Sequence, residues 1–233
     1  MTMKWLSVLF QNFISLFYPP LCVGCSEALL TNEKFLCSEC FSDLPKTNYH
    51  FFKDNRAYEQ LSIRFPIERA SAYLYYNKHG LGQKLVAAVK YQKNSSLGEW
   101  LGTFLAEDLL SSDFFKDIDC LVPVPLHKKK QKERGFNQSE ALTKGISAVT
   151  GIPVNTNTLY RARANVSQTR KGVYERWQNT QNIFGVKDVA CFKNRHLLLI
   201  DDVLTTGSTL EACARALLQC ENARVSVLCL AIA

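Results

Sequence analysis

Two adjacent carboxylates, Asp201 and Asp202, follow a short apolar run and precede a turn rich in hydroxyl groups. The apolar residues 197–200 predict a buried strand that ends at the aspartates, and a helix is predicted over 210–219. Between strand and helix, the turn from Thr205 to Thr209 carries a single glycine. Residues of these types could bind a phosphorylated sugar, with the turn on the phosphate and the carboxylates on the sugar.

The chemistry of this turn favours an anion. A helix N-terminus presents unpaired backbone N–H groups, and the helix dipole adds to their attraction for a phosphate. Gly207 lets the backbone approach without a Cβ in the way, and carboxylate oxygens accept hydrogen bonds from sugar hydroxyls. The alternative interpretation is an ordinary strand-to-helix turn with Ser/Thr capping. Paired carboxylates next to a row of small polar residues favour a phosphate and ribose site.

A basic segment follows a second apolar strand, which is predicted over 120–125. We expect residues 126–136 to form a loop at the carboxyl end of that strand. An isolated run of charge is usually a solvated loop. Here, however, an arginine, a glycine and two amides stand at the entry of a predicted helix, and this combination suits a polyanion. The cations of the segment are Lys128, Lys129, Lys130, Lys132 and Arg134.

A third segment, over 161–179, is also basic and poor in core-type residues. Its cations exceed what Glu175 can pair, so we interpret it as a charged flap that closes over a ligand. The two basic segments together offer a track for a single-stranded phosphate backbone. The cations of this segment are Arg161, Arg163, Arg170, Lys171 and Arg176.

Two Cys-x-x-Cys knuckles lie near the N-terminus, separated by residues 26–36. Each knuckle directs two thiolates toward one point, so the four thiolates predict a closed, structural Zn²⁺ site in a zinc-ribbon-like module. A pair of redox dithiols is the alternative. The remaining cysteines show no metal spacing, and we interpret them as small core or surface residues. The four predicted ligands are Cys22, Cys25, Cys37 and Cys40.

Composition bounds the class of protein. A chain of 233 residues, 47% of them apolar, suits one α/β domain of ordinary size with a small appendage. The net charge of +7 indicates an anionic partner, such as a nucleotide, pyrophosphate or nucleic acid. Residues 1–18 carry an apolar face at helical spacing without a secretory cleavage pattern, so we expect a cytoplasmic protein whose N-terminal helix docks on its own surface. Peripheral membrane contact is the alternative for that helix.

The elements that position these residues alternate between strands and helices, which predicts an α/β fold with a mostly parallel sheet. A ligand would bind at the carboxyl ends of the strands, where the two aspartates fall. We place a domain boundary between an N-terminal part, 1–64, whose stretch 41–64 is an irregular connector, and the sheet domain, 65–233. The other predicted elements are strands over 69–76, 152–154 and 225–231 and helices over 80–90, 97–110 and 137–150.

The strand, acidic pair and Thr/Gly-rich turn resemble the phosphoribosyl pyrophosphate (PRPP) signature of type I phosphoribosyltransferases. The resemblance implies that Asp201 and Asp202 hold the ribose hydroxyls and that the turn holds the 5′-phosphate. It also implies Mg²⁺ bridging the oxygens of the ligand. The PRPP-binding residues implied are Asp201, Asp202, Val203, Thr205, Thr206, Gly207, Ser208, Thr209 and Arg134.

The order of motifs along the chain resembles the ComF/GntX family of competence proteins. The matching features are the zinc knuckles, a Val-Pro-Val-Pro strand leading into Arg134-Gly-Phe-Asn-Gln138, a Gln-Thr segment at 168–169 and the PRPP signature. The stretch 170–172 departs from a more apolar run in related sequences. The resemblance implies that Arg134 faces the pyrophosphate, and that the protein handles incoming single-stranded DNA in the cytoplasm with a helicase or translocase partner.

Three hypotheses follow. The first is a PRPP-binding protein that assists natural DNA transformation, with the lysines and arginines of both basic segments on single-stranded DNA. The second is a metabolic phosphoribosyltransferase, in which Arg134 would stabilise the departing pyrophosphate and Asp201 or Asp202 would be the catalytic carboxylates. The third is a non-enzymatic adaptor that senses the ligand.

Overall fold

A four-stranded parallel sheet forms the centre of the protein, in a computed structural model that describes residues 19–91, 94–161 and 183–233. The strand order is β1-β6-β5-β2, and every neighbouring pair is parallel. This confirms the predicted α/β class. The strands are β1 (Ala70–Tyr75), β2 (Cys120–Pro123), β5 (His196–Leu204) and β6 (Arg224–Ile232).

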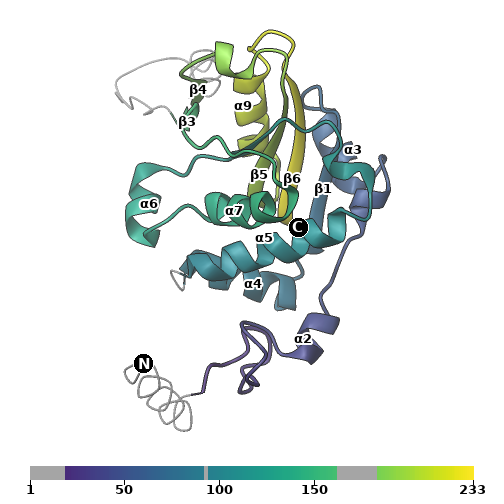
Figure 1. Ribbon diagram of the computed structural model, residues 1–233, viewed down its shortest axis with the longest axis vertical. Helices are drawn as coiled ribbons and strands as arrows, with labels where there is room; N and C mark the ends of the chain where they lie inside the picture. Colours follow the sequence, from purple (N-terminus) through teal and green to yellow (C-terminus); the bar gives the residue numbers. More distant parts are fainter. Residues whose placement is uncertain (1–18, 92–93, 162–182) are drawn as a thin grey trace, which may run out of the picture.

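Helices cover both faces of this sheet (Figure 1). Alternating residues of β5 point to opposite faces: Leu198 and Ile200 join one apolar cluster, and Leu197 and Leu199 join the other. The first cluster holds α4 (Leu81–Tyr91), α5 (Ser95–Leu109) and α7 (Gln138–Thr150), and the second holds α3 (Arg56–Ser62) and α9 (Ser208–Leu217). Burial on both faces explains why the strands are continuous apolar runs rather than alternating ones.

Asparagine caps fix the starts of three helices. The side chain of Asn94 accepts a hydrogen bond from Leu97 N, that of Asn137 from Ser139 N, and that of Asn55 from the backbone of α3. These bonds satisfy N–H groups that a helix leaves unpaired in its first turn. Asn137 thereby sets where α7 begins, next to the carboxyl ends of the strands.

Four sequence predictions need correction. Residues 126–136 are not a loop, because Lys128–Arg134 form the short helix α6, which ends at Gly135 in the left-handed region. The stretch 41–64 is not wholly irregular, since it contains α3. Strand β5 does not stop before the aspartates but continues through them to Leu204. The predicted strand over 152–154 is reduced to one isolated bridge between Leu121 and Val154.

A small antiparallel pair was not anticipated. Strand β3 (Leu159–Arg161) pairs with β4 (Phe184–Val186), and both lie beside α9 (Figure 1). The predicted flap connects these two strands, but 162–182 lie outside the described residues. The strands are too short for periodicity to reveal them.

The cysteine-rich segment packs against α5. Phe35 and Phe41 make edge contacts with Trp100, with ring centroids 5.6 and 6.0 Å apart, and Phe41 also contacts Phe104. Lys84 Nζ donates to the carbonyl oxygen of Gly24 at 2.6 Å. Aromatic packing and a charged hydrogen bond therefore tie this segment to the helical layer.

Helices α5 and α7 approach so closely that their contact admits only glycine. A Cβ on Gly102 would overlap the carbonyl oxygen of Leu142, a backbone atom that cannot move independently of α7. We expect Gly102→Ala to lower the free energy of unfolding by about 3 kcal/mol, the usual size of core overpacking. Urea denaturation measures this loss.

Gly135→Ala is the matched control, because no atom lies near the position of its Cβ. The left-handed φ of +85° at Gly135 should make this variant lose only about 1 kcal/mol of stability. Equal losses in both variants would contradict the steric explanation.

No helix among the described residues is long and apolar enough to cross a membrane. The N-terminal helix predicted over 1–18, with its docking or membrane-contact role, lies outside the described residues.

Candidate functional site

The two aspartates at the carboxyl end of β5 are held by side chains from two different helices. Asp201 Oδ1 accepts hydrogen bonds from Ser139 Oγ at 3.0 Å and from Asp202 N at 2.9 Å. Asp202 Oδ2 lies 3.2 Å from Lys90 Nζ, at the end of α4. The central strand thus presents both carboxylates between α7 and α4, and each has a defined partner.

Burial raises the pKa of Asp201 to about 7, and the negative charge of Asp202 adds to the rise. Hydrogen bonds from Asp202 N and Ser139 Oγ and the charge of Lys90 act in the opposite direction. The pair therefore carries less than two full negative charges near neutral pH. A buried carboxylate whose pKa is raised beside a second carboxylate is typical of functional sites.

The turn after β5 has the features expected of an anion cradle. Gly207 has a φ of +77°, and a Cβ there would lie 3.0 Å from Leu61 of α3. The Gln60 side chain donates to the carbonyl oxygen of Thr205, so α3 also holds the turn from behind. Gly207 is the N-cap of α9 and has no side chain that could cap it, in contrast to the asparagines of α3, α5 and α7; Thr206 Oγ1 accepts a long hydrogen bond, 3.5 Å, from Ser208 N. Among the described residues no side chain accepts from Thr209 N or Leu210 N, so these N–H groups can bind an anion.

Cations from three segments line the cavity in front of the aspartates. This cavity, here called the acidic-pair cavity, has a volume of about 170 Å³. Its lining joins two carboxylates to four cationic side chains, so a ligand with both hydroxyl and phosphate groups is complementary to it. The lining residues are Lys90, Val124, Pro125, Leu126, Lys130, Arg134, Asn137, Gln138, Ser139, Arg161, Asp201, Asp202 and Thr209.

Four of the nine predicted PRPP-binding residues converge here. Asp201, Asp202, Arg134 and Thr209 line the acidic-pair cavity, and Lys130 and Arg161 join them from the two basic segments. Arg134 donates to Gln138 Oε1 at 2.8 Å, and its guanidinium lies 5.7 Å from the ring of Tyr91. Of the other predicted residues, Val203 lies in β5, Thr205, Thr206 and Gly207 form the turn between β5 and α9, and Ser208 is the first residue of α9.

The remaining predicted DNA-binding residues do not line the acidic-pair cavity or cannot be placed. Lys129 and Lys132 are exposed on α6, and Lys128 opens that helix. The rest of the second basic segment, Arg163, Arg170 and Lys171, lies outside the described residues. Their role on single-stranded DNA stays a prediction.

Two site residues, Lys90 and Ser139, were not predicted from the sequence. Lys90 lies in the last turn of the amphipathic helix α4, where it looks like an ordinary surface lysine. Ser139 stands one residue beyond the Asn-Gln pair that was singled out. The usable signal was indirect: two adjacent buried carboxylates require a cation or hydrogen-bond donors from another segment.

A larger cavity adjoins this site. It has a volume of about 780 Å³ and shares Pro125, Leu126 and Arg161 with the acidic-pair cavity. We call it the β3 cavity, because Leu159, Tyr160 and Arg161 of β3 form one wall. Its other lining residues are His127, Gln131, Glu140, Thr156, Asn157 and Lys187.

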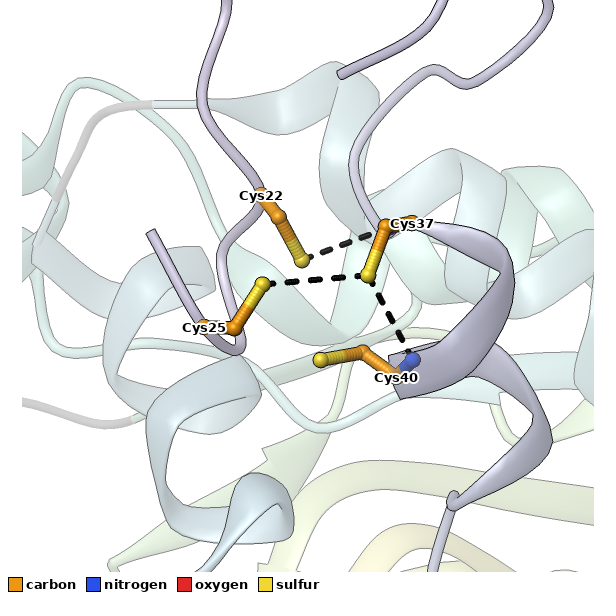
Figure 2. A group of neighbouring side chains, drawn as sticks. All are labelled: Cys22, Cys25, Cys37 and Cys40. Atoms are coloured by element: carbon orange, nitrogen blue, oxygen red, sulfur yellow. Dashed lines mark hydrogen bonds between the residues drawn. The ribbon is translucent and has the colours of Figure 1, made fainter. Parts of the chain in front are cut away.

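The four predicted metal ligands meet in one cluster (Figure 2). The sulfur atoms of Cys22, Cys25, Cys37 and Cys40 all lie within 4.8 Å of one another, and those of Cys25 and Cys37 are 3.7 Å apart. A tetrahedron of sulfur atoms around Zn²⁺ with Zn–S bonds of about 2.3 Å has edges of about 3.8 Å. Cys22 Sγ also accepts hydrogen bonds from Gly24 N and Cys37 N, as metal-bound thiolates do. The cluster could therefore hold a metal ion such as zinc.

Comparison with known proteins defines the class first. Residues 139–232 match the phosphoribosyl transferase domain family. Together with the parallel sheet and the acidic pair at the end of β5, this match shows a phosphoribosyltransferase-type α/β domain, with the four-cysteine cluster on its N-terminal side.

Similar proteins refine this class. The DNA utilization protein YhgH of Escherichia coli K12 is 29% identical over 213 residues, which cover 90% of this chain and 89% of that protein. Competence protein F of Haemophilus influenzae is 31% identical over 140 residues, 57% of this chain and 60% of that protein. The YhgH of Salmonella typhi is 31% identical over 149 residues, 63% of this chain, and the match spans 65% of that relative's length. The resemblance to the ComF family of competence proteins is confirmed.

Solved structures also resemble part of the chain. The glutamine PRPP amidotransferase of B. subtilis, complexed with ADP and GMP, matches with a TM-score of 0.44 at 17% identity. The match covers 61% of this chain and 30% of that one.

The raised pKa of Asp201 predicts a stability that depends on pH. The ordinary pKa of an aspartate is about 4, so between about pH 4 and about pH 7 the folded protein holds a proton that the unfolded chain has released. Stability from this group therefore falls as the pH rises through that window and levels off above it. We expect Asp201→Asn to stabilise the protein by about 1–2 kcal/mol more at pH 8 than at pH 5.

Urea denaturation at the two pH values measures this difference. Asp54→Asn, which changes an exposed carboxylate that lines neither cavity, is the control and should shift stability equally at both. If the gain in the free energy of unfolding for Asp201→Asn is the same at both pH values, the raised pKa of Asp201 is contradicted.

Proposed function

We propose that this protein binds PRPP in the acidic-pair cavity and that it assists the handling of incoming single-stranded DNA in the cytoplasm. One observation carries the proposal: the two carboxylates, Thr209 in the first turn of α9 and four cations line the same small cavity. Asp201 and Asp202 would accept hydrogen bonds from the ribose hydroxyls, and the turn of residues 205–209 would hold the 5′-phosphate. Lys130, Arg134 and Arg161 would face the pyrophosphate.

Two metal ions belong to this proposal. Zn²⁺ would be held by the four cysteines and would fix the N-terminal module against α5, without an open position for chemistry. Mg²⁺ would arrive with the phosphates of the ligand, because it is usually held by substrate oxygens with one or two carboxylates. The oxygens of Asp201 and Asp202 suit that ion, and it would neutralise charge on the departing pyrophosphate.

Two observations support the part of the proposal that concerns DNA: the names of similar proteins and the positive charge of α6. YhgH is called a DNA utilization protein, and the H. influenzae relative is called a competence protein. Lys129 and Lys132 are exposed beside a cavity that Lys130 and Arg161 line, so a phosphate backbone could run along α6 toward β3. A helicase or translocase that delivers the strand would be the protein partner.

A metabolic phosphoribosyltransferase is the second candidate function. The β3 cavity favours it, since this cavity adjoins the acidic pair and is large enough to admit an acceptor base or amine. Arg134, Asp201 and Asp202 would then be the catalytic residues, through stabilisation of the leaving pyrophosphate and of the ribosyl centre.

A binding and turnover assay separates the candidates. Isothermal titration with PRPP and Mg²⁺, with and without single-stranded DNA, tests the ligand, and pyrophosphate release with a panel of bases tests catalysis. PRPP binding, together with a salt-dependent DNA shift that weakens when Lys128, Lys129 and Lys130 are changed to glutamine, supports the first proposal. Rapid turnover with one base would favour the metabolic enzyme. Absence of PRPP binding would overturn both.

A further inference from the structure

The β3 cavity carries a charge pattern that differs from the one expected for a neutral base. Two cationic side chains, Arg161 and Lys187, stand on its β3 and β4 sides, and His127 lines it from the start of α6. Among the described residues that line it, Glu140 is the single acid. The carboxylate of Glu140 already accepts a hydrogen bond from Asn137 at 3.2 Å. The cavity therefore has an excess of positive charge that a neutral ligand would leave unused.

The uncharged groups of the cavity add hydrogen-bond donors. The side chains of Gln131, Thr156, Asn157 and Tyr160 can each donate to an acceptor oxygen. A phosphate group has several acceptor oxygens and no donors at neutral pH, so it matches such a lining. A nucleobase instead requires donors and acceptors in a fixed alternation.

Stacking surfaces are also scarce. Besides the imidazole of His127, Tyr160 is the single aromatic ring among the described lining residues, and it lies against Gly185 of the paired strand. The ammonium of Lys187 lies 6.0 Å from its ring centroid. A base held between two aromatic faces is therefore not what this wall provides, whereas a lysine ammonium and a tyrosine hydroxyl in the same lining suit a phosphate.

Arg161 lines both cavities, so a ligand in the β3 cavity would lie next to a side chain that also lines the acidic-pair cavity. Its guanidinium lies 5.3 Å from the ring of Phe184, which holds it at the junction. A planar guanidinium can bind two anionic groups through separate edges. The two cavities could thus be filled at once, each with phosphate oxygens on one side of Arg161.

We propose that the β3 cavity is a second phosphate site that accepts the phosphate of a nucleotide, either free or within a DNA strand, beside the PRPP site. This inference rests on the proposed function for the ligand in the neighbouring cavity, but its own contacts are those of Arg161 and Lys187. It makes the acceptor or partner of this protein a nucleotide rather than a free base.

Isothermal titration with dAMP, deoxyadenosine and adenine tests the class of ligand. We expect dAMP to bind at least about tenfold more tightly than deoxyadenosine, because a charged hydrogen bond in a partly screened site is worth roughly 1.4 kcal/mol or more. Lys187→Gln should weaken the binding of dAMP by about fivefold or more. Lys193→Gln is the matched control: this exposed lysine pairs with Glu221 and lies outside the cavity, so it should leave dAMP binding unchanged.

A competition experiment identifies the cavity. Separate sites predict that dAMP still binds when PRPP and Mg²⁺ are saturating, whereas displacement by PRPP would put dAMP in the acidic-pair cavity and overturn the proposal. Deoxyadenosine that binds as tightly as dAMP, or a Lys187→Gln variant equal to wild type, would also overturn it. If PRPP itself fails to bind while dAMP responds to Lys187→Gln, the proposed function fails and the second phosphate site stands.

Oligonucleotides distinguish the two sources of phosphate. A dT10 strand with a 5′-phosphate that binds more tightly than the same strand without it, with the difference lost in Lys187→Gln, identifies a strand end. Equal binding of both strands, weakened by Lys187→Gln, identifies an internal phosphate. Binding of dAMP with no response of either strand to Lys187→Gln identifies a free nucleotide.

Discussion

Asp202→Asn should weaken PRPP binding by about 30-fold. The side chain of Asp202 points from the end of β5 toward the cavity that Arg134 and Thr209 also line. A hydroxyl bound to a carboxylate contributes roughly 1.5–3 kcal/mol, and an amide acceptor keeps the shape without the charge. Isothermal titration with PRPP and Mg²⁺ at pH 8 measures the loss.

The fold should be unaffected by this substitution. Asparagine has nearly the shape of aspartate, and the ion pair that is lost, between Asp202 and Lys90, is partly exposed and worth at most about 1 kcal/mol. Asp119→Asn is the matched control, because Asp119 accepts a hydrogen bond from His196 N at the opposite end of β5. It should leave PRPP affinity unchanged. An Asp202→Asn protein that keeps wild-type affinity would contradict the assignment of this carboxylate to the ribose.

Lys90 provides an internal check on the same assignment. Its ammonium faces Asp202 at 3.2 Å, so Lys90→Met should leave that carboxylate uncompensated and lower PRPP affinity. If the lysine acts through Asp202, the double variant loses less affinity than the sum of the two single losses. Additive losses would mean that Lys90 contacts the ligand independently. Lys144→Met, which removes an exposed lysine of α7 that pairs with Glu99 of α5, is the control.

The parts of the site that were predictable are those whose signals are local. The apolar run of β5, the glycine at the turn and the helix that follows are encoded within a few consecutive residues, so the acidic pair and the turn after it could be placed from the sequence. Likewise, the spacing of cysteines within each knuckle identifies ligands that the structure brings within 4.8 Å. Local patterns of this kind can be recognised in the sequence because they do not depend on how the elements pack.

The parts that were missed depend on contacts between distant segments. Lys90 meets Asp202 only because the fold brings the last turn of α4 to the carboxyl end of β5, and nothing in the sequence around Lys90 indicates its partner. Helix α6 was taken for a loop because four lysines in a short stretch suggest solvation, although lysine and glutamine are good helix formers.

The role of α3 was hidden in the same way. The stretch before it is rich in aromatic and polar residues, and its helical signal is short. In the structure, Leu61 is fully buried beneath the turn at Gly207, and Ala57 joins the same apolar cluster. The residues just before position 65 thus help to shape the turn at Gly207, while the exact domain boundary stays a prediction.

Removal of one cysteine of the cluster should abolish metal binding and release the N-terminal module. Cys37 is the best target, because its sulfur lies 3.7 Å from that of Cys25 and accepts a hydrogen bond from Cys40 N. Structural zinc contributes about 10–16 kcal/mol to the folding of small metal-bound modules. We expect Cys37→Ser to reduce bound zinc from one equivalent to near zero, measured by elemental analysis of the purified protein.

Loss of the metal should be visible at Trp100. Phe35 and Phe41 shield this ring, so unfolding of the module exposes it and shifts its fluorescence to longer wavelength. Replacing Trp5 and Trp177 by phenylalanine isolates the signal, and a chelator should produce the same shift in the parent protein.

The sheet domain should keep its own unfolding transition in this experiment, because β5, β6 and α9 form an apolar cluster that contains no residue of the module. Cys191→Ser is the control, since Cys191 is exposed and lies outside the cluster. A Cys37→Ser protein that retains a full equivalent of zinc would contradict the metal site. Recovery of the parent protein without zinc but with paired disulfides would favour redox dithiols instead.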